Sequence, residues 1–128
     1  MKIIYFSQLF YPSIFGGGKY FLYMISYELA KRGHQIHVIT QKLKGTPNFE
    51  IFESINVHRV GNEMEFRGTL PPTIKHNATY VLESFLTARK ILNEYAKSHS
   101  KIDIIHSSPF VPVLSAHLIS GVRLRLIP

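Results

Sequence analysis

Three consecutive glycines, Gly16, Gly17 and Gly18, followed by Lys19, have the types and spacing that point most directly to chemistry. They lie between an apolar run at residues 2–7 and the start of a helical pattern. Glycines let a backbone come close to a ligand, and free N–H groups at a helix start suit a phosphate or a sugar hydroxyl. The same glycines also fit a flexible turn that lets a helix pack tightly on a sheet. Composition alone leaves both interpretations open.

Two familiar nucleotide-binding motifs do not fit this loop. A dinucleotide fingerprint needs G-x-G-x-x-G and an acidic residue at the end of the second strand. Here Phe21 stands at the third glycine position, and the second strand ends in Thr40 and Gln41. A P-loop needs Ser or Thr after Gly-Lys, whereas Tyr20 follows Lys19. A dinucleotide-dependent oxidoreductase is therefore the least favoured function class, and measurable NAD affinity would revive it.

The histidines, of which there are seven, raise the question of a metal site. His34 and His37 are three residues apart, but they belong to a helix end and to a strand, so their side chains should not converge. No carboxylate partner lies near them in the sequence. Because the chain has no cysteine, disulfides and thiolate metal sites are excluded. No metal site is predicted.

Hydrophobic periodicity predicts the strands that must position these residues. Apolar runs at residues 2–7, 36–40 and 102–106 are typical of strands buried on both faces of a parallel sheet. Residues 51–52 and 55–60 predict one short strand or an irregular hairpin.

Apolar residues at three- and four-residue steps predict three helices. The first starts at Lys19, and the second begins after Thr73, a residue type that caps helix starts. The third opens at Pro109 and is closed by Gly121. Residues 61–72, which contain two glycines and two prolines, are typical of a loop.

The alternation of strands and helices predicts the α/β fold class. We expect a Rossmann-like doubly wound parallel sheet in a three-layer α/β/α arrangement, with ligands at the carboxyl ends of the strands. Residues 124–128 stand where a fifth strand should begin, so the domain is expected to be truncated before its later strands. An open parallel edge would remain, and such an edge favours self-association.

Length and charge narrow the function further. The 128 residues suffice for one domain. A net charge of +7 favours anionic ligands, but the basic residues form no run longer than two, so nucleic acid is not an expected partner. No apolar run approaches the roughly 18 residues of a membrane span. Pro12 and the glycines occupy the place where a signal peptide would have its cleavage site, so no signal peptide is predicted. A cytoplasmic protein is therefore expected.

The order and spacing of several phrases carry a family resemblance. Tyr11-Pro12 precedes the glycine loop, and Glu-Leu-Ala-Lys-Arg-Gly-His at residues 28–34 precedes the second strand. A later strand reads Asp-Ile-Ile-His at residues 103–106. From Met1 to about Ser120, the chain resembles the N-terminal, acceptor-side domain of GT-B glycosyltransferases of the family 4 type.

The resemblance implies a two-domain enzyme that moves a sugar from a nucleotide-sugar donor to a hydroxyl acceptor without an obligatory metal. The nucleotide-sugar is a co-substrate, and no other cofactor is implied. Residues 1–128 would form an incomplete N-terminal domain without the donor-binding C-terminal domain. The isolated chain is therefore expected to be inactive and to need a donor-binding domain or chain as its partner.

By the same resemblance, Gly16, Gly17, Gly18 and Lys19 line the substrate cleft. Many members of that family have His-x-His after the aliphatic residues of the later strand, whereas this chain has His106 followed by two serines. The position of the second histidine is thus Ser108, which cannot accept a proton unaided at neutral pH. His106 either contributes to catalysis or packs under the end of the sheet, and the packing role is favoured.

Two further expectations concern membranes and a non-catalytic role. A loop with Phe10, Tyr11, Phe15 and Lys19 would touch lipid if the acceptor is lipid-linked, giving a peripheral contact with the inner face of a membrane.

The alternative to an enzyme is a non-catalytic Rossmann-like remnant or binding module for a phosphorylated or sugar ligand. Turnover of labelled nucleotide-sugars separates the two.

Overall fold

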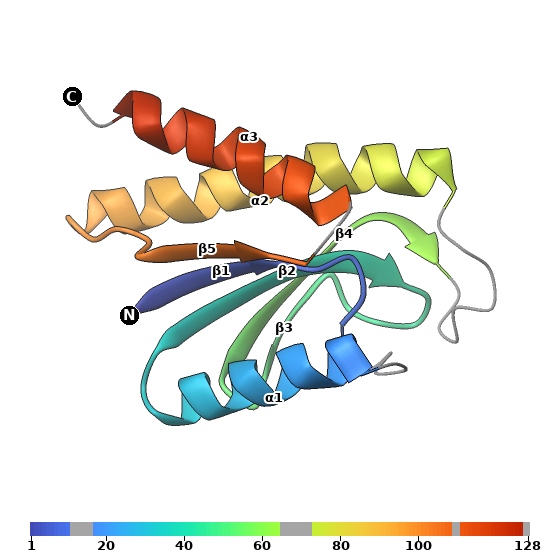
Figure 1. Cartoon of the computed structure of the whole chain (residues 1–128), viewed down its shortest axis with the longest axis horizontal. Helices are drawn as coiled ribbons and strands as arrows, with labels where there is room; N and C mark the ends of the chain where they lie inside the picture. The colour runs from blue at the N-terminus through green and yellow to red at the C-terminus, as the bar shows by residue number, and fades with distance from the viewer. Residues whose placement is uncertain (11–16, 65–72, 109–110, 127–128) are drawn as a thin grey trace.

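The computed structural model describes residues 1–10, 17–64, 73–108 and 111–126. Figure 1 shows three layers, with one helix below a sheet and two helices above it. The strands are mostly parallel, and the helices cover both faces of the sheet. This arrangement confirms the predicted Rossmann-like α/β class.

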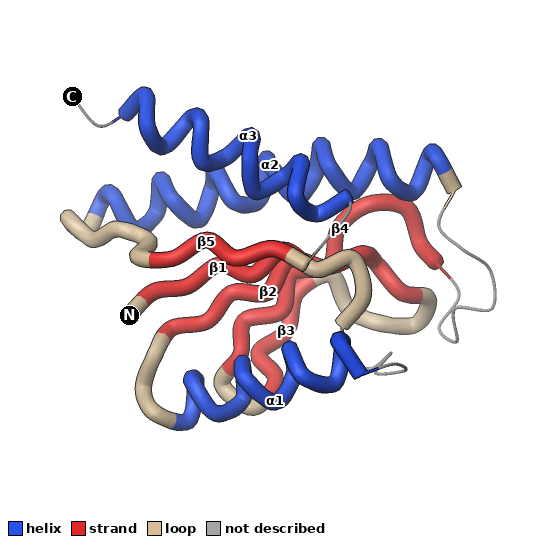
Figure 2. The backbone as a smooth tube through the Cα atoms, in the orientation of Figure 1, coloured by secondary structure: helices blue, strands red, loops and turns tan. Residues whose placement is uncertain are grey.

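The described strands form one five-stranded sheet in the order β3-β4-β2-β1-β5 (Figure 2). All neighbouring pairs are parallel except β3 and β4, which are antiparallel. The strands are β1 (Lys2–Phe6), β2 (Gln35–Leu43), β3 (Phe49–Phe52), β4 (Ile55–Met64) and β5 (Ile104–Ser107). The parallel strands therefore share one carboxyl edge, and β5 has an open side in the described part of the sheet.

The helices are α1 (Gly17–Lys31), α2 (Ile74–Lys97) and α3 (Val111–Leu126). Each follows a parallel strand in the sequence, as a βαβ chain requires. Their N-termini consequently lie towards the carboxyl edge of the sheet, as Figure 1 shows.

Strand alternation divides the core between the two faces. In β1, Ile3 and Tyr5 pack with α1, whereas Ile4 and Phe6 pack with α2 and α3. All four are buried, as expected for a central strand of a parallel sheet. Full burial of one such side chain contributes roughly 1.5–3 kcal/mol, so the central strands hold the layers together.

The start of α2 follows from its capping residues. Thr73 has an extended backbone, and its hydroxyl accepts a hydrogen bond from the His76 amide. The His76 ring in turn accepts from the Thr73 amide at 3.0 Å, which completes a reciprocal capping box. The predicted N-cap at Thr73 is confirmed.

The structure decides two predictions about the middle of the chain, a strand or hairpin within residues 51–60 and a loop from Gly61. Residues 49–52 and 55–64 form a two-stranded hairpin, which resolves the alternative that the sequence left open. The loop predicted from Gly61 is wrong for residues 61–64, because β4 continues to Met64. The register passes from the Gln41–Val60 pair to the Leu43–Met64 pair, so the extra residues of the irregularity, Gly61 among them, lie in β4 and do not end the strand. Residues 65–72 lie outside the described residues.

The predicted end of the third helix is wrong. Helix α3 continues through Gly121 to Leu126, so no strand begins within residues 124–126. A single glycine costs a helix only about 1 kcal/mol, and the Leu and Arg residues that follow are good helix formers. The predicted start at Pro109 lies outside the described residues, as do residues 127–128.

Phe10 is not the exposed lipid-contacting residue that the sequence suggested. Its ring is fully buried and lies 6.2 Å from the Tyr23 ring, in the cluster beneath α1. Burial of a large aromatic surface outweighs the polar character of the surrounding loop. Tyr11 and Phe15 lie outside the described residues. Among the described helices, none is both long and apolar enough to cross a membrane.

Candidate functional site

The carboxyl ends of β1, β2 and β5 form one continuous rim. The Ser108 amide donates to the Phe6 carbonyl at 2.8 Å, and the Ser7 amide donates to the Ile39 carbonyl at 3.2 Å. Ser107 lies opposite Phe6 in the parallel register. Small hydroxyl residues thus follow two adjacent strands at the position where open α/β sheets bind ligands.

Carboxamide side chains link this rim to β4 and α2. The Gln8 amide nitrogen donates to the Asn77 side-chain oxygen at 2.8 Å and to the Gln41 side-chain oxygen at 3.3 Å. The Gln41 side-chain nitrogen donates to the backbone carbonyl of Asn62 at 2.6 Å. We call Gln8, Gln41, Asn62 and Asn77 the amide cluster. It joins segments that are distant in sequence through uncharged groups.

Close packing around Gly61 shows how tightly the amide cluster is built. Gly61 has a φ of +83°, the left-handed region that glycine tolerates. A Cβ atom there would lie 2.6 Å from the Gln41 amide nitrogen and 3.2 Å from the Tyr80 backbone nitrogen. The missing side chain therefore allows Gln41 to reach the Asn62 carbonyl.

The helix starts give this edge its electrostatic character. None of α1, α2 and α3 has an acidic residue in its first turn. The first four N–H groups of each helix lack intrahelical partners, and the helix dipole is positive at that end. Glu63 is exposed on β4 nearby, while its carbonyl contacts the His76 ring at 3.0 Å. Three positive helix ends at one edge favour an anionic group such as a diphosphate.

The predicted glycine loop is partly redefined. Helix α1 starts at Gly17 rather than at Lys19, so Gly17, Gly18 and Lys19 form its first turn. The first four N–H groups of a helix have no intrahelical acceptor, so those of Gly17, Gly18 and Lys19 are not used in hydrogen bonds within the helix. Gly16 lies outside the described residues. The backbone amides of residues 17–19 thus belong to the helix end that faces the carboxyl edge.

His106 and Ser108 occupy different surroundings. The His106 ring lies 5.2 Å from the Tyr5 ring on the α1 side of the sheet, and the residue is exposed. His106 was expected to pack under the end of the sheet, but among the described residues its ring contacts only the Tyr5 ring of the neighbouring strand. The other side of His106 is exposed because β5 is an edge strand with no described neighbour beyond it. Ser108 is held at the rim by its amide bond to Phe6 and is half-buried.

Sequence reasoning missed the amide cluster. Its available signal was positional: Gln8 follows the first strand, and Gln41 ends the run predicted for the second. Polar residues at the carboxyl ends of parallel strands point to a ligand edge. Asn77 carried no such signal, because it lies in the first turns of α2 and reaches Gln8 only through tertiary packing.

A second polar network lies between the sheet and α2, towards the amino ends of the strands. His37 Nδ1 lies 3.0 Å from His58 Nε2, and His37 Nε2 lies 2.8 Å from the Tyr95 hydroxyl. Tyr95 donates to the Gln35 side-chain oxygen at 2.7 Å. Since Tyr95 donates outward, it accepts from His37 Nε2–H, and His37 Nδ1 then accepts from His58 Nε2–H. His37 therefore carries a single ring proton and is neutral.

Burial accounts for the neutrality of these rings. Desolvation, with smaller effects of His37 and Lys90, lowers the pKa of His58 to about 4. Desolvation also lowers the pKa of His37, against an opposing effect of Glu94. Through Gln35, which pairs with Lys2 at the start of β1, the network reaches the opposite end of the sheet from the rim. We therefore treat it as a structural element.

The histidines singled out for metal binding bond to different partners. His34 Nδ1 contacts the amino terminus at 2.8 Å, whereas His37 belongs to the network above. In the described parts of the chain, no group of three His, Asp or Glu side chains is arranged to hold a metal ion.

A comparison with protein-family models gives one match to this chain. The model described as Glycosyltransferase Family 4 matches residues 15–127, which covers α1 through α3 and most of the sheet. No curated protein matches the chain significantly.

Proposed function

The chain belongs to glycosyltransferase family 4, and we propose that it forms the acceptor-side half of a GT-B enzyme. The reaction would move a sugar from a nucleotide-sugar to a hydroxyl acceptor. The bond between the anomeric carbon and the diphosphate oxygen breaks, and a bond to the acceptor oxygen forms. The hydroxyl proton is released, and the nucleoside diphosphate departs.

The carboxyl edge is the observation that carries this proposal. Three helix ends without first-turn acids meet the rim of Ser7 and Ser108, beside the amide cluster. Backbone amides of Gly17 and Gly18 would stabilise the negative charge that develops on the departing diphosphate. By the family resemblance, Gly16 and Lys19 would also contact the substrate. The net charge of +7 fits an anionic co-substrate.

We further propose that a donor-binding domain or chain completes the cleft. The described edge supplies hydroxyl, amide and helix-end groups, which orient a sugar or a phosphate but do not select a nucleotide base. Transfer would need no obligatory metal, and a cytoplasmic location suits a nucleotide-sugar. His106 and Ser108 would act as substrate-contacting groups at the rim, where Ser108 can donate a hydrogen bond but cannot serve alone as a base.

A transfer assay tests this proposal. Protein purified from its natural host is mixed with radiolabelled nucleotide-sugars and with water-soluble and lipid fractions from that host. Incorporation of label into an acceptor is expected, and residues 1–128 alone should give none. Substitution of Asn77→Ala should lower transfer about fivefold, since the part-buried hydrogen bond from Gln8 is worth about 1 kcal/mol. Asn93→Ala, at an exposed position of α2, is the matched control. Absence of incorporation with every donor would refute an enzymatic role.

One observation supports a second candidate function. The members of the amide cluster are uncharged, so the cluster itself offers no proton acceptor. A non-catalytic module that binds a phosphorylated or sugar ligand would need nothing more. Saturable binding of a nucleotide-sugar without transfer, in the purified protein, would favour this candidate.

A further inference from the structure

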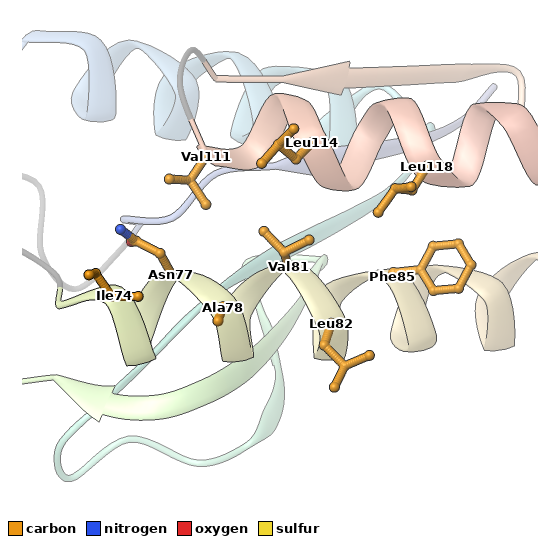
Figure 3. Close-up of a pocket in the computed structure, with 9 residues that line it drawn as sticks. All are labelled: Ile74, Asn77, Ala78, Val81, Leu82, Phe85, Val111, Leu114 and Leu118. Carbon is orange, nitrogen blue, oxygen red and sulfur yellow. The ribbon is translucent and has the colours of Figure 1, made fainter.

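An apolar groove of about 520 Å³ lies between α2 and α3. Figure 3 shows side chains from the two helices facing each other across it. Asn77 is its one polar lining residue among those the structure describes. The lining comprises Ile74, Asn77, Ala78, Val81, Leu82, Phe85, Val111, Leu114 and Leu118.

The groove is uncovered in the described structure. Ile74 is 88% exposed, Leu82 is 60% exposed and Leu114 is 57% exposed. Helix α3 is apolar on both sides, since Ile119 is buried against the sheet while Leu118 faces outward at 48% exposure. A helix that is apolar all round normally buries both sides, and a contiguous exposed apolar surface marks a binding site.

The groove runs away from the carboxyl edge. Ile74 and Asn77 lie in the first turns of α2, and Val111 starts α3, so one end of the groove opens at the rim. Asn77 bonds to Gln8 there, which makes this end continuous with the amide cluster. Phe85 and Leu118 line the distant end. At about 1.5 Å per residue, the stretch from Ile74 to Phe85 is roughly 17 Å long.

Charge at the mouth of the groove complements an anion. Lys75 is exposed next to Ile74 in the first turn of α2, and it forms no ion pair with a described residue. Neither α2 nor α3 has an acidic residue in its first turn. Positive charge at one end and hydrocarbon along the rest match a molecule with an anionic head and an apolar chain.

We propose that the groove holds the hydrocarbon chain of an amphipathic acceptor, with its phosphate-bearing head at the rim beside Lys75. This inference rests on the proposed function, because it defines the acceptor as lipid-linked. It places the lipid contact on α2 and α3 rather than at the loop around Phe10, whose ring is buried. A single lipid molecule is bound, not a membrane surface.

Calorimetric titration with octyl, decyl and dodecyl phosphate, each below its micelle concentration, tests the proposal. Each methylene buried in the groove should tighten binding about fourfold, so affinity rises steeply with chain length. Inorganic phosphate should bind far more weakly. Length-independent binding, or none, overturns the proposal. Affinity that appears only when dodecyl phosphate is held in lipid vesicles also overturns it, since a membrane surface would then be the partner.

A matched pair of variants locates the chain in the groove. Ala78→Trp fills the groove and should weaken dodecyl phosphate binding at least tenfold. Ala96→Trp makes the same change at an exposed position of α2 outside the groove and should leave binding unchanged. Equal binding by both variants overturns the proposal. Leu114→Gln, at an exposed lining position, repeats the test should Ala78→Trp fail to fold.

Two further measurements separate the alternatives. A wild-type dimer in sedimentation that Ala78→Trp dissociates would show that a second copy covers the groove, and it would overturn the lipid proposal. Sugar transfer to water-soluble acceptors alone, without length-dependent binding, would overturn this inference and leave the glycosyltransferase function intact. Binding of dodecyl phosphate without transfer would instead leave the groove valid and refute the enzyme.

Discussion

Acidification should destabilise this protein through the His37–His58–Tyr95 network. In the folded chain, His37 is neutral because its Nδ1 accepts from His58 and its Nε2–H donates to Tyr95, which donates to Gln35. His58 is neutral because burial lowers its pKa. Protonation of His37 Nδ1 would place its N–H opposite the N–H of His58 Nε2, so neither group would have an acceptor there. The unfolded chain has no such constraint and binds protons at the ordinary histidine pKa of 6.5. Between that value and the folded pKa, the unfolded state therefore holds more protons.

The sign and size of the effect follow from linkage. Because the folded pKa of His58 is lowered to about 4, its contribution to stability is complete above pH 6.5 and is lost as the pH falls towards 4. Between pH 7 and pH 5, the loss from His58 alone is about 2 kcal/mol. The lowered pKa of His37 acts in the same direction. This loss is a large fraction of the 5–15 kcal/mol that stabilises an ordinary domain.

Urea denaturation followed by circular dichroism, at intervals from pH 7.5 to pH 4.5, measures this loss. His58→Gln keeps an N–H donor for His37 but cannot titrate, so its unfolding free energy should vary much less with pH. His117→Gln, at an exposed position of α3, should retain the wild-type slope. Equal pH dependence in the wild type and His58→Gln would refute the reasoning. The Asp103 carboxylate loses its own stabilising contribution mainly below its ordinary pKa of 3.8, because its folded pKa is lowered, so it adds little to the slope above pH 4.5.

Other predictions follow from close packing and from the sheet edge. Gly61→Ala should destabilise the fold by more than Gly45→Ala. Both glycines have a φ of +83°, but only at position 61 would the new Cβ lie against Gln41. Equal losses of unfolding free energy in urea denaturation would contradict this. Ser84 donates to Ser115 at 2.7 Å in a fully buried contact between α2 and α3, so each single alanine variant should cost about 1–2 kcal/mol and the double variant less than their sum. A double-mutant cycle with additive losses would argue against the bond. The open side of β5 should cause concentration-dependent association in sedimentation, whereas a monodisperse monomer at high concentration would exclude it.

The elements predicted well from sequence are those whose signal is local. Helix α2 combines an N-cap at Thr73 with a long apolar stripe, of which Ala88 is buried in the core and Phe85, Leu92 and Tyr95 pack against it. The runs at residues 2–7 and 36–40 are central strands for the same reason, because apolar residues predominate in both, as burial on both faces requires.

Predictions failed where a local signal competed with a tertiary one. Gly121 has the residue type of a helix stop, yet α3 continues, because each further residue adds a backbone hydrogen bond at the small cost of one glycine. Gly61 resembled a loop residue, but pairing with β2 keeps it in β4. Phe10 looked like an exposed loop aromatic, and only the position of Tyr23 on α1 reveals the cluster that buries it.

The amide cluster gives the carboxyl edge its shape rather than its chemistry. Gln41 is fully buried, with one amide N–H committed to the Asn62 carbonyl and its oxygen to Gln8. Gln8 in turn uses its amide nitrogen on both Gln41 and Asn77. Groups already bonded to one another in a low-dielectric site are costly to redirect towards a ligand. Under the proposed function, contact with the anionic co-substrate would therefore fall to the helix-end amides, and contact with the apolar chain of the proposed acceptor to the groove that opens at Asn77.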